Sequence, residues 1–258
     1  MRLAPSLLAL AFAPALALAG SALDGTWKLR IGSMKATGRP DSRLVVDGTY
    51  SCSSCVPALE NVPTDGAFHA VSGHAYYDEI RIRVLGPNVL EVTTQRGGHP
   101  VSLTTYTVAA DGRTLTGRFT DSTGTMPATG SFIERRVGRA VAGAHPASGQ
   151  WLLHGLKDMN EAARLFTYAM TADGFSMKSN GQSYDAKFDG RKYPVIGDPG
   201  GTQVVLRRID DHTVHETDYR QDMVVDEVRL SASGDTLRMT DHNIAHRQTT
   251  VMVLDRQP

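Results

Sequence analysis

Two short segments open equivalent halves of this 258-residue sequence. Residues 23–32 read LDGTWKLRIG and residues 148–157 read SGQWLLHGLK. Trp27 and Trp151 are the only two tryptophans in the chain, and each follows a glycine by two positions. A repeat of this kind constrains the fold strongly, because each copy must be a structural unit that the chain forms twice.

The similarity between the halves extends well beyond the tryptophans. The segment that begins at Asp65-Gly66 aligns without a gap with the one that begins at Asp189-Gly190, a shift of 124 residues. After a change of two residues in length, ADGRTLTGRFTD aligns with ASGDTLRMTDHN. The sequence therefore predicts a tandem duplication. Its units span residues 23–137 and 149–258, and the Gly- and Pro-bearing residues 138–148 link them.

Each half consists of short segments with alternating side chains, separated by residue pairs that favour tight turns. Asp173-Gly174, Asn180-Gly181 and Ser233-Gly234 are examples in the second half. Short connections make successive strands antiparallel neighbours, and closing such a sheet into a barrel removes its exposed edges. The predicted fold is all-β, with two tandem antiparallel up-and-down β-barrels of eight or nine strands and little helix.

The GxW motif at the start of each half resembles that of lipocalins and related calycins, and the whole chain is similar to tandem lipocalin-like proteins secreted by bacteria. In that family the tryptophan plugs the closed end of the barrel, and an arginine near the last strand covers its ring. The resemblance implies that Arg135 and Arg256, which end the two halves, take this structural role with Trp27 and Trp151. A guanidinium over an indole contributes about 0.5–2 kcal/mol.

The N-terminus has the features of a secretory signal peptide. Met1-Arg2 precedes a Leu- and Ala-rich stretch, and Ala17-Leu18-Ala19 fits a cleavage site, with residues 20–22 as an alternative. A membrane anchor is the competing interpretation, but Pro5 and Pro14 interrupt the short apolar stretch. We expect residues 1–22 to be a signal peptide and the mature protein to be periplasmic or extracellular, with no later membrane-spanning segment.

Cys52 and Cys55 are the only cysteines. In an oxidising compartment they are expected to form a local disulfide. A redox site or a zinc site that includes His69 or His74 remains an alternative, although no βαβ pattern surrounds the pair.

The formal net charge is zero, with 27 basic and 27 acidic residues. This balance argues against a nucleic-acid partner, which needs a basic surface. No nucleophile, metal-binding or nucleotide-binding motif is present. The sequence therefore favours a non-enzymatic protein with no catalytic residues, no cofactor and no metal, and it does not predict an oligomeric state.

One predicted strand carries charged residues on a single face. Val214, Glu216, Asp218 and Arg220 share that face by alternation, and Asp241 lies on the corresponding face of a later strand. If this face points inward, the carboxylates and Arg220 enter a cavity that suits a polar or cationic ligand or a metal, because buried carboxylates need partners.

The opposite orientation is also open, and it is the more common one for charged side chains. It would bury Thr213, His215, Thr217 and Tyr219 and leave the charges in water. His212 and His215, like His242 and His246, are expected to be exposed loop or strand-end residues and not metal ligands.

These features leave three functional interpretations. The first is a lipocalin-like protein that binds a small apolar or amphipathic molecule. The second is a structural or interaction module of the cell envelope, with filled barrels. The third is an isomerase or hydrolase that uses Glu216, Asp218 and His215.

Overall fold

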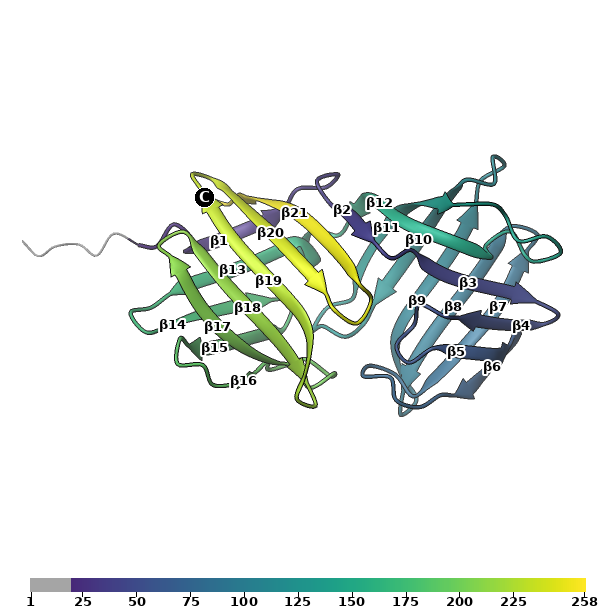
Figure 1. The fold of residues 1–258 in the computed structure, drawn as a ribbon, viewed down its shortest axis with the longest axis horizontal. Coiled ribbons are helices and arrows are strands. Elements are labelled where there is room, and N and C mark those ends of the chain that lie inside the picture. Colours follow the sequence, from purple (N-terminus) through teal and green to yellow (C-terminus); the bar gives the residue numbers. More distant parts are fainter. Residues whose placement is uncertain (1–19) are drawn as a thin grey trace, which may run out of the picture.

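The computed structural model describes residues 20–258, which form two antiparallel sheets, each nearly closed into a barrel (Figure 1). The only helix in this part of the chain is a single 3-10 turn, η1 (Glu161–Arg164). The predicted all-β class with two up-and-down barrels is therefore confirmed. The predicted signal peptide lies almost entirely outside the described residues.

One sheet, called the N-barrel here, contains ten strands that follow one another in sequence order. Its edge strands β5 and β6 are separated in the chain by Thr64 alone. The strands are β3 (Asp41–Val46), β4 (Thr49–Cys52), β5 (Leu59–Pro63), β6 (Asp65–Ala70), β7 (Glu79–Gly86), β8 (Val89–Arg96), β9 (His99–Val108), β10 (Thr114–Asp121), β11 (Ala128–Val137) and β12 (Gly149–Met159).

The other sheet, the C-barrel, has ten strands in its main path, and the short β2 (Lys35–Gly38) pairs onto β21. Backbone hydrogen bonds between Ser183 and Ile196 bring its two edges together. Its strands are β1 (Gly25–Leu29), β13 (Leu165–Met170), β14 (Gly174–Ser179), β15 (Gln182–Lys187), β16 (Tyr193–Pro194), β17 (Gln203–Asp210), β18 (Thr213–Arg220), β19 (Met223–Ser233), β20 (Thr236–Asn243) and β21 (Gln248–Arg256).

The opening strands of the two halves are exchanged between the barrels. β1 lies between β13 and β21 of the C-barrel, and β12 lies between β3 and β11 of the N-barrel. In Figure 1 the purple β1 therefore lies beside the yellow β21. Sequence analysis placed each strand in the half that it opens. The exchange has a local cause, since β12 is simply the next antiparallel neighbour of β11 after the 138–148 connection.

Each tryptophan lies in the core of the barrel that it enters. Trp27 and Trp151 are fully buried, and each indole N–H donates to the carbonyl four residues earlier, on Leu23 and Ala147, at 2.9 Å. A buried indole N–H requires such an acceptor. The tryptophans are thus structural residues of the barrel cores.

An arginine stacks over each indole, with 4.1 Å between the guanidinium carbon and the ring centroid. Arg256 covers Trp27, and Arg136, not the expected Arg135, covers Trp151. Arg135 is the neighbouring residue on β11, so its side chain points to the other face, is exposed and bonds Thr114. Each stacked pair joins the two halves of the sequence.

The glycine before each tryptophan makes room for this arginine. Gly25 and Gly149 have φ values of 118° and 121°, which side-chain-bearing residues rarely adopt. A Cβ on Gly149 would lie 2.5 Å from Nη1 of Arg136, and one on Gly25 would lie 3.1 Å from Nη1 of Arg256. In the GxW motif, the glycine therefore leaves space for the arginine, and the tryptophan supplies the indole that the arginine covers.

The two cysteines form the expected local disulfide, Cys52–Cys55, at the end of β4. Cys52 is buried in the N-barrel core, together with Trp151, Ile82 and Leu90. The disulfide therefore ties the β4–β5 connection to that core.

The strand exchange predicts that neither half folds alone. Residues 20–148 lack β12, and residues 149–258 lack β1, so each fragment leaves a gap in a barrel and a tryptophan without its pocket. We expect each isolated fragment to show the red-shifted fluorescence of an exposed indole and no cooperative urea transition. Mixing the fragments is expected to restore both blue-shifted emission and cooperative unfolding. A fragment that unfolds cooperatively by itself with a buried tryptophan would contradict the exchange.

Candidate functional site

The inner face of the C-barrel changes from apolar to acidic along the barrel axis. Near the base, Val214 on β18, Leu230 on β19 and Leu237 on β20 belong to the core that contains Trp27. Toward the other end, the same faces carry four carboxyl groups, here called the acidic layer: Glu216, Asp218, Asp226 and Asp241. Cross-strand register places Glu216 and Asp241 opposite Val228, and Asp218 opposite Asp226.

Hydrogen bonding shows that this face points inward. Glu216 is only 9% exposed, and its carboxylate accepts a 2.6 Å hydrogen bond from the hydroxyl of Tyr184. Tyr184 lies on β15 and is itself part of the core. Of the two orientations left open by the sequence, the structure therefore has the one with Glu216, Asp218 and Asp241 inside. Their role in ligand binding remains a prediction.

Three of the four carboxyl groups lack a full set of partners. Asp218, Asp226 and Asp241 each have one oxygen that is shielded from solvent and accepts no hydrogen bond from any described residue. Buried polar atoms are normally paired, because an unpaired one loses its hydration without replacement. The acidic layer therefore holds unused capacity to accept hydrogen bonds or a positive charge.

Burial and mutual repulsion change the protonation of the layer. Burial, followed by the negative charge of Glu216, raises the pKa of Asp218 to about 9. Burial, followed by the charges of Asp226 and Glu216, raises the pKa of Asp241 to about 6. The carboxyl groups of Glu216 and Asp218 are close enough to share a hydrogen bond. Burial also raises the pKa of Glu216, so the two neighbouring carboxyl groups both hold their protons more tightly than free acids do.

Arg220, which was also predicted to line this site, does not neutralise the acids. Its guanidinium donates to the hydroxyl of Thr202 at 3.1 Å and to the hydroxyl of Tyr76 at 2.8 Å. Within the described residues, none of its nitrogens forms an ion pair with a carboxylate. The charge of Arg220 still lowers the pKa of Asp226, which burial raises.

The N-barrel provides an internal comparison. The repeat alignment places Val92, Thr94, Ser102 and Phe119 at the positions of Glu216, Asp218, Asp226 and Asp241. The hydroxyls of Thr94 and Ser102 are hydrogen-bonded to each other at 2.7 Å, so these two positions satisfy one another. The acidic layer is thus a feature of the C-barrel and not of the repeated fold.

The N-barrel also contains a buried ion pair whose two members satisfy each other. Arg43 donates two hydrogen bonds to Glu134, at 2.7 and 2.8 Å, and both side chains are buried. The guanidinium also lies 4.3 Å from the ring centroid of Tyr106. A bidentate pair of this kind satisfies both ions, which leaves no free charge at this place.

Sequence reasoning missed Asp226 and Tyr184. Asp226 faces Asp218 across β18 and β19. The repeat alignment, which pairs Asp226 with Ser102, could have pointed to this residue. Tyr184 carried no signal, since its partner Glu216 lies 32 residues away. His215 alternates with Glu216 on β18 and faces the other side of the sheet, so it does not join the two carboxyl groups as the isomerase or hydrolase interpretation required.

In residues 20–258, no group of three or more His, Cys, Asp or Glu side chains has a geometry that could hold a metal ion. The ring of His242 hydrogen-bonds Thr249 at 2.9 Å, and the backbone N–H of His246 bonds Asn243. No helix in the described part of the chain is long and apolar enough to cross a membrane.

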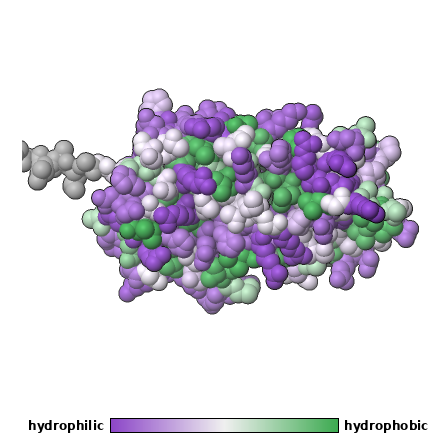
Figure 2. Space-filling model, turned by 45° about the horizontal axis from the view of Figure 1, so that its top comes forward, coloured by the Kyte–Doolittle hydropathy of each residue, from purple (hydrophilic) through white to green (hydrophobic). Residues whose placement is uncertain are grey.

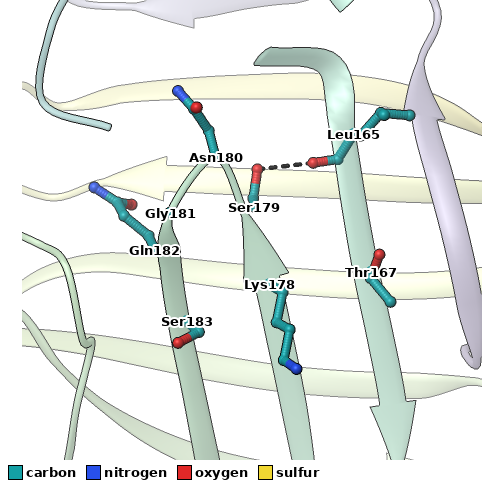
Figure 3. Close-up of a pocket in the computed structure, with 8 residues that line it drawn as sticks. All are labelled: Leu165, Thr167, Lys178, Ser179, Asn180, Gly181, Gln182 and Ser183. Atoms are coloured by element: carbon teal, nitrogen blue, oxygen red, sulfur yellow. Dashed lines mark hydrogen bonds between the residues drawn. The ribbon is translucent and has the colours of Figure 1, made fainter. Parts of the chain in front are cut away.

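A surface pocket of about 340 Å³ lies elsewhere on the C-barrel, over the turn between β14 and β15 (Figure 3). Its lining is mainly polar, and the hydroxyl of Ser179 is used by a 2.9 Å hydrogen bond to the carbonyl of Leu165. Lys178 is exposed. The pocket therefore lacks the unpartnered buried groups that distinguish the acidic layer.

The raised pKa of Asp218 predicts an unusual dependence of stability on pH. An unfolded aspartate ionises near its usual pKa of 3.8, whereas folded Asp218 keeps its proton to about pH 9. The folded state binds more protons in this window, so the free energy of unfolding falls as the pH rises. We expect Asp218→Thr, the residue of the N-barrel, to flatten this decline and to stabilise the protein by about 1–3 kcal/mol at mildly alkaline pH.

Urea denaturation at several pH values measures this effect. Glu227→Gln, which changes an exposed carboxylate on β19, is the matched control and should leave the decline in place. A decline that is equally steep in the Asp218→Thr protein would disprove the assignment.

We compared the chain with protein-family models, curated proteins and solved structures. None of these comparisons gives a match. The function is therefore argued from the geometry of the acidic layer.

Proposed function

We propose that this protein is a lipocalin-like, non-enzymatic binding protein, and that its C-barrel takes up a small amphipathic molecule with a cationic group. The observation that carries the proposal is the acidic layer, with its three unpartnered, buried carboxyl oxygens above an apolar core. A ligand cation would supply the counter-charge and the hydrogen-bond donors that this part of the chain lacks.

Partly exposed apolar side chains of the C-barrel suit the rest of such a ligand. Phe166, Met177, Val228 and Met252 pack against the core but remain partly exposed. Val228 is also the direct cross-strand neighbour of Glu216. Binding sites for small molecules commonly combine an apolar lining with a few polar groups that fix orientation. The acids would fix the head group, and these side chains would contact the apolar tail.

Export of the protein is part of the same proposal. It is supported by the N-terminal sequence pattern and by the Cys52–Cys55 disulfide, a bond typical of oxidising compartments. A periplasmic or extracellular protein would meet amphipathic molecules outside the cytoplasm.

The main competing proposal is a structural module with filled barrels. The buried Arg43–Glu134 pair and the fully buried Trp151 favour it for the N-barrel. On the face in Figure 2, apolar side chains form separate patches between hydrophilic ones, so this face offers no broad apolar surface for a protein partner. We therefore assign a scaffold role to the N-barrel and ligand binding to the C-barrel.

Matched detergents test the charge preference. Dodecyltrimethylammonium and dodecanoate share a chain length but differ in the sign of the head group, and calorimetric titration gives both affinities. We expect the cation to bind and the anion to bind at least about tenfold more weakly. Asp226→Ser and Glu216→Val, which copy the N-barrel, should each weaken cation binding by about tenfold.

Thr94→Ala, at the equivalent position of the N-barrel, is the control and should not alter the affinity. Equal affinity for both detergents would exclude the cationic preference. Unchanged cation affinity in both acidic-layer variants would exclude this site.

Binding of the cation should also depend on pH. The ligand favours ionised carboxyl groups, but burial keeps Asp218 protonated to about pH 9 and Asp241 to about pH 6. Binding must therefore release protons, and affinity for dodecyltrimethylammonium should increase from about pH 5 to about pH 9. The quaternary ammonium does not titrate, so the change reports on the protein. An affinity that falls with pH would contradict this reasoning, and Asp218→Thr should reduce the increase.

A further inference from the structure

The ends of the two barrels that lie opposite the tryptophans contact each other. Arg220 donates to the hydroxyl of Tyr76, which lies in the β6–β7 connection of the N-barrel. Arg96 donates to the backbone carbonyl of Pro199, which lies between β16 and β17 of the C-barrel. Arg96 and Arg220 are equivalent in the repeat, so the two contacts are related by the internal symmetry.

The equivalent of Tyr76 in the second half is Gly200, and this difference breaks the symmetry. A Cβ on Gly200 would lie 2.7 Å from the Tyr76 ring, so the ring occupies the space that a side chain would need. The guanidinium of Arg220 lies 4.8 Å from the Tyr76 ring centroid. The N-barrel thus places an aromatic hydroxyl beside Arg220 of the C-barrel.

We propose that Tyr76 is a positioning residue of the C-barrel site, which holds Arg220 away from the acidic layer and so keeps the carboxylates free for a cation. The effect on cation binding rests on the proposed function, whereas the contact between Tyr76 and Arg220 does not. Arg220 alternates with Asp218 and Glu216 on β18, so it belongs to the same inward face. Its hydrogen bonds to side chains nevertheless go to two hydroxyls, on Thr202 and Tyr76.

A guanidinium prefers a carboxylate to a neutral hydroxyl, because charge-assisted hydrogen bonds are stronger. Asp226 is close enough for the charge of Arg220 to lower its pKa. Asp198, on the loop side, is partly used by a 2.7 Å hydrogen bond from the backbone N–H of Thr202. Without the Tyr76 hydroxyl, Arg220 would turn toward Asp226 and act as an internal counter-ion that competes with the ligand.

The surroundings of Asp226 determine what a measurement of its titration would report. The charged or titratable groups that act on it or face it are Glu216, Asp218 and Arg220 from β18, Asp241 and His242 from β20, and His246 from the β20–β21 turn. Of these, only Arg220 contacts Tyr76. We therefore expect a change in Asp226 that follows mutation of Tyr76 to pass through Arg220, although Tyr76 also contacts Asp198 and Thr202.

Carboxyl titration by NMR in the ligand-free protein tests the inference. Tyr76→Phe keeps the ring and removes the hydroxyl, and we expect the pKa of Asp226 to fall by about one unit as Arg220 approaches. Arg220→Met should raise the pKa of Asp226 instead. In the double variant, Tyr76→Phe should have no further effect. An Asp226 that titrates unchanged in Tyr76→Phe, or a further shift in the double variant, would overturn the inference.

The matched control is Arg96→Met, which breaks the symmetry-related contact between the barrels without touching the acidic layer. It should leave Asp226 unchanged, whereas an equal shift in this variant would attribute the effect to general loosening of the interface. Affinity for dodecyltrimethylammonium should fall about tenfold in Tyr76→Phe and rise in Arg220→Met. If the wild-type protein binds no detergent, the proposed function fails, but the NMR titration still decides the role of Tyr76.

Discussion

Closure of both barrels depends on an arginine stacked over a buried tryptophan. Arg256 covers Trp27 and Arg136 covers Trp151, and in each pair the two residues come from different halves of the sequence. The indole lies in the barrel core, while the guanidinium joins the last strand of one half to the opening strand of the other. Neither barrel is a product of one repeat copy, so the whole chain is the folding unit.

The sequence predicted the strands, the barrels and the buried tryptophans, because these follow from alternation, turn residues and the repeat. It could not predict which barrel receives β1 or β12. Both strands carry the same pattern, and either barrel offers the same kind of neighbours. The expected role of Arg135 failed by one position, since adjacent residues on a strand point to opposite faces and the register with Trp151 selects Arg136.

The sequence predicted which of the candidate site's side chains share a face, but not the whole set. Alternation correctly grouped Glu216, Asp218 and Asp241, but it could not decide which face was inside. The fourth acid, Asp226, joins the acidic layer because β19 pairs with β18, near a register irregularity. A pattern within one strand does not reveal this pairing. Tyr76 is 144 residues from Arg220 and lies in a loop, so only the packing of the two barrels brings it to the site.

The duplication explains how a costly acidic layer can persist. Unpartnered carboxyl groups destabilise a fold, whereas the N-barrel has hydroxyls that satisfy each other at the positions of Asp218 and Asp226, and it pairs its buried ions, Arg43 and Glu134. Because the opening strands β1 and β12 are exchanged, the two barrels are covalently linked within one folding unit. A stable N-barrel therefore also stabilises the C-barrel. One copy can then keep groups that cost stability. The same exchange fixes the barrels end to end, which makes a residue of one barrel available to position a side chain in the other.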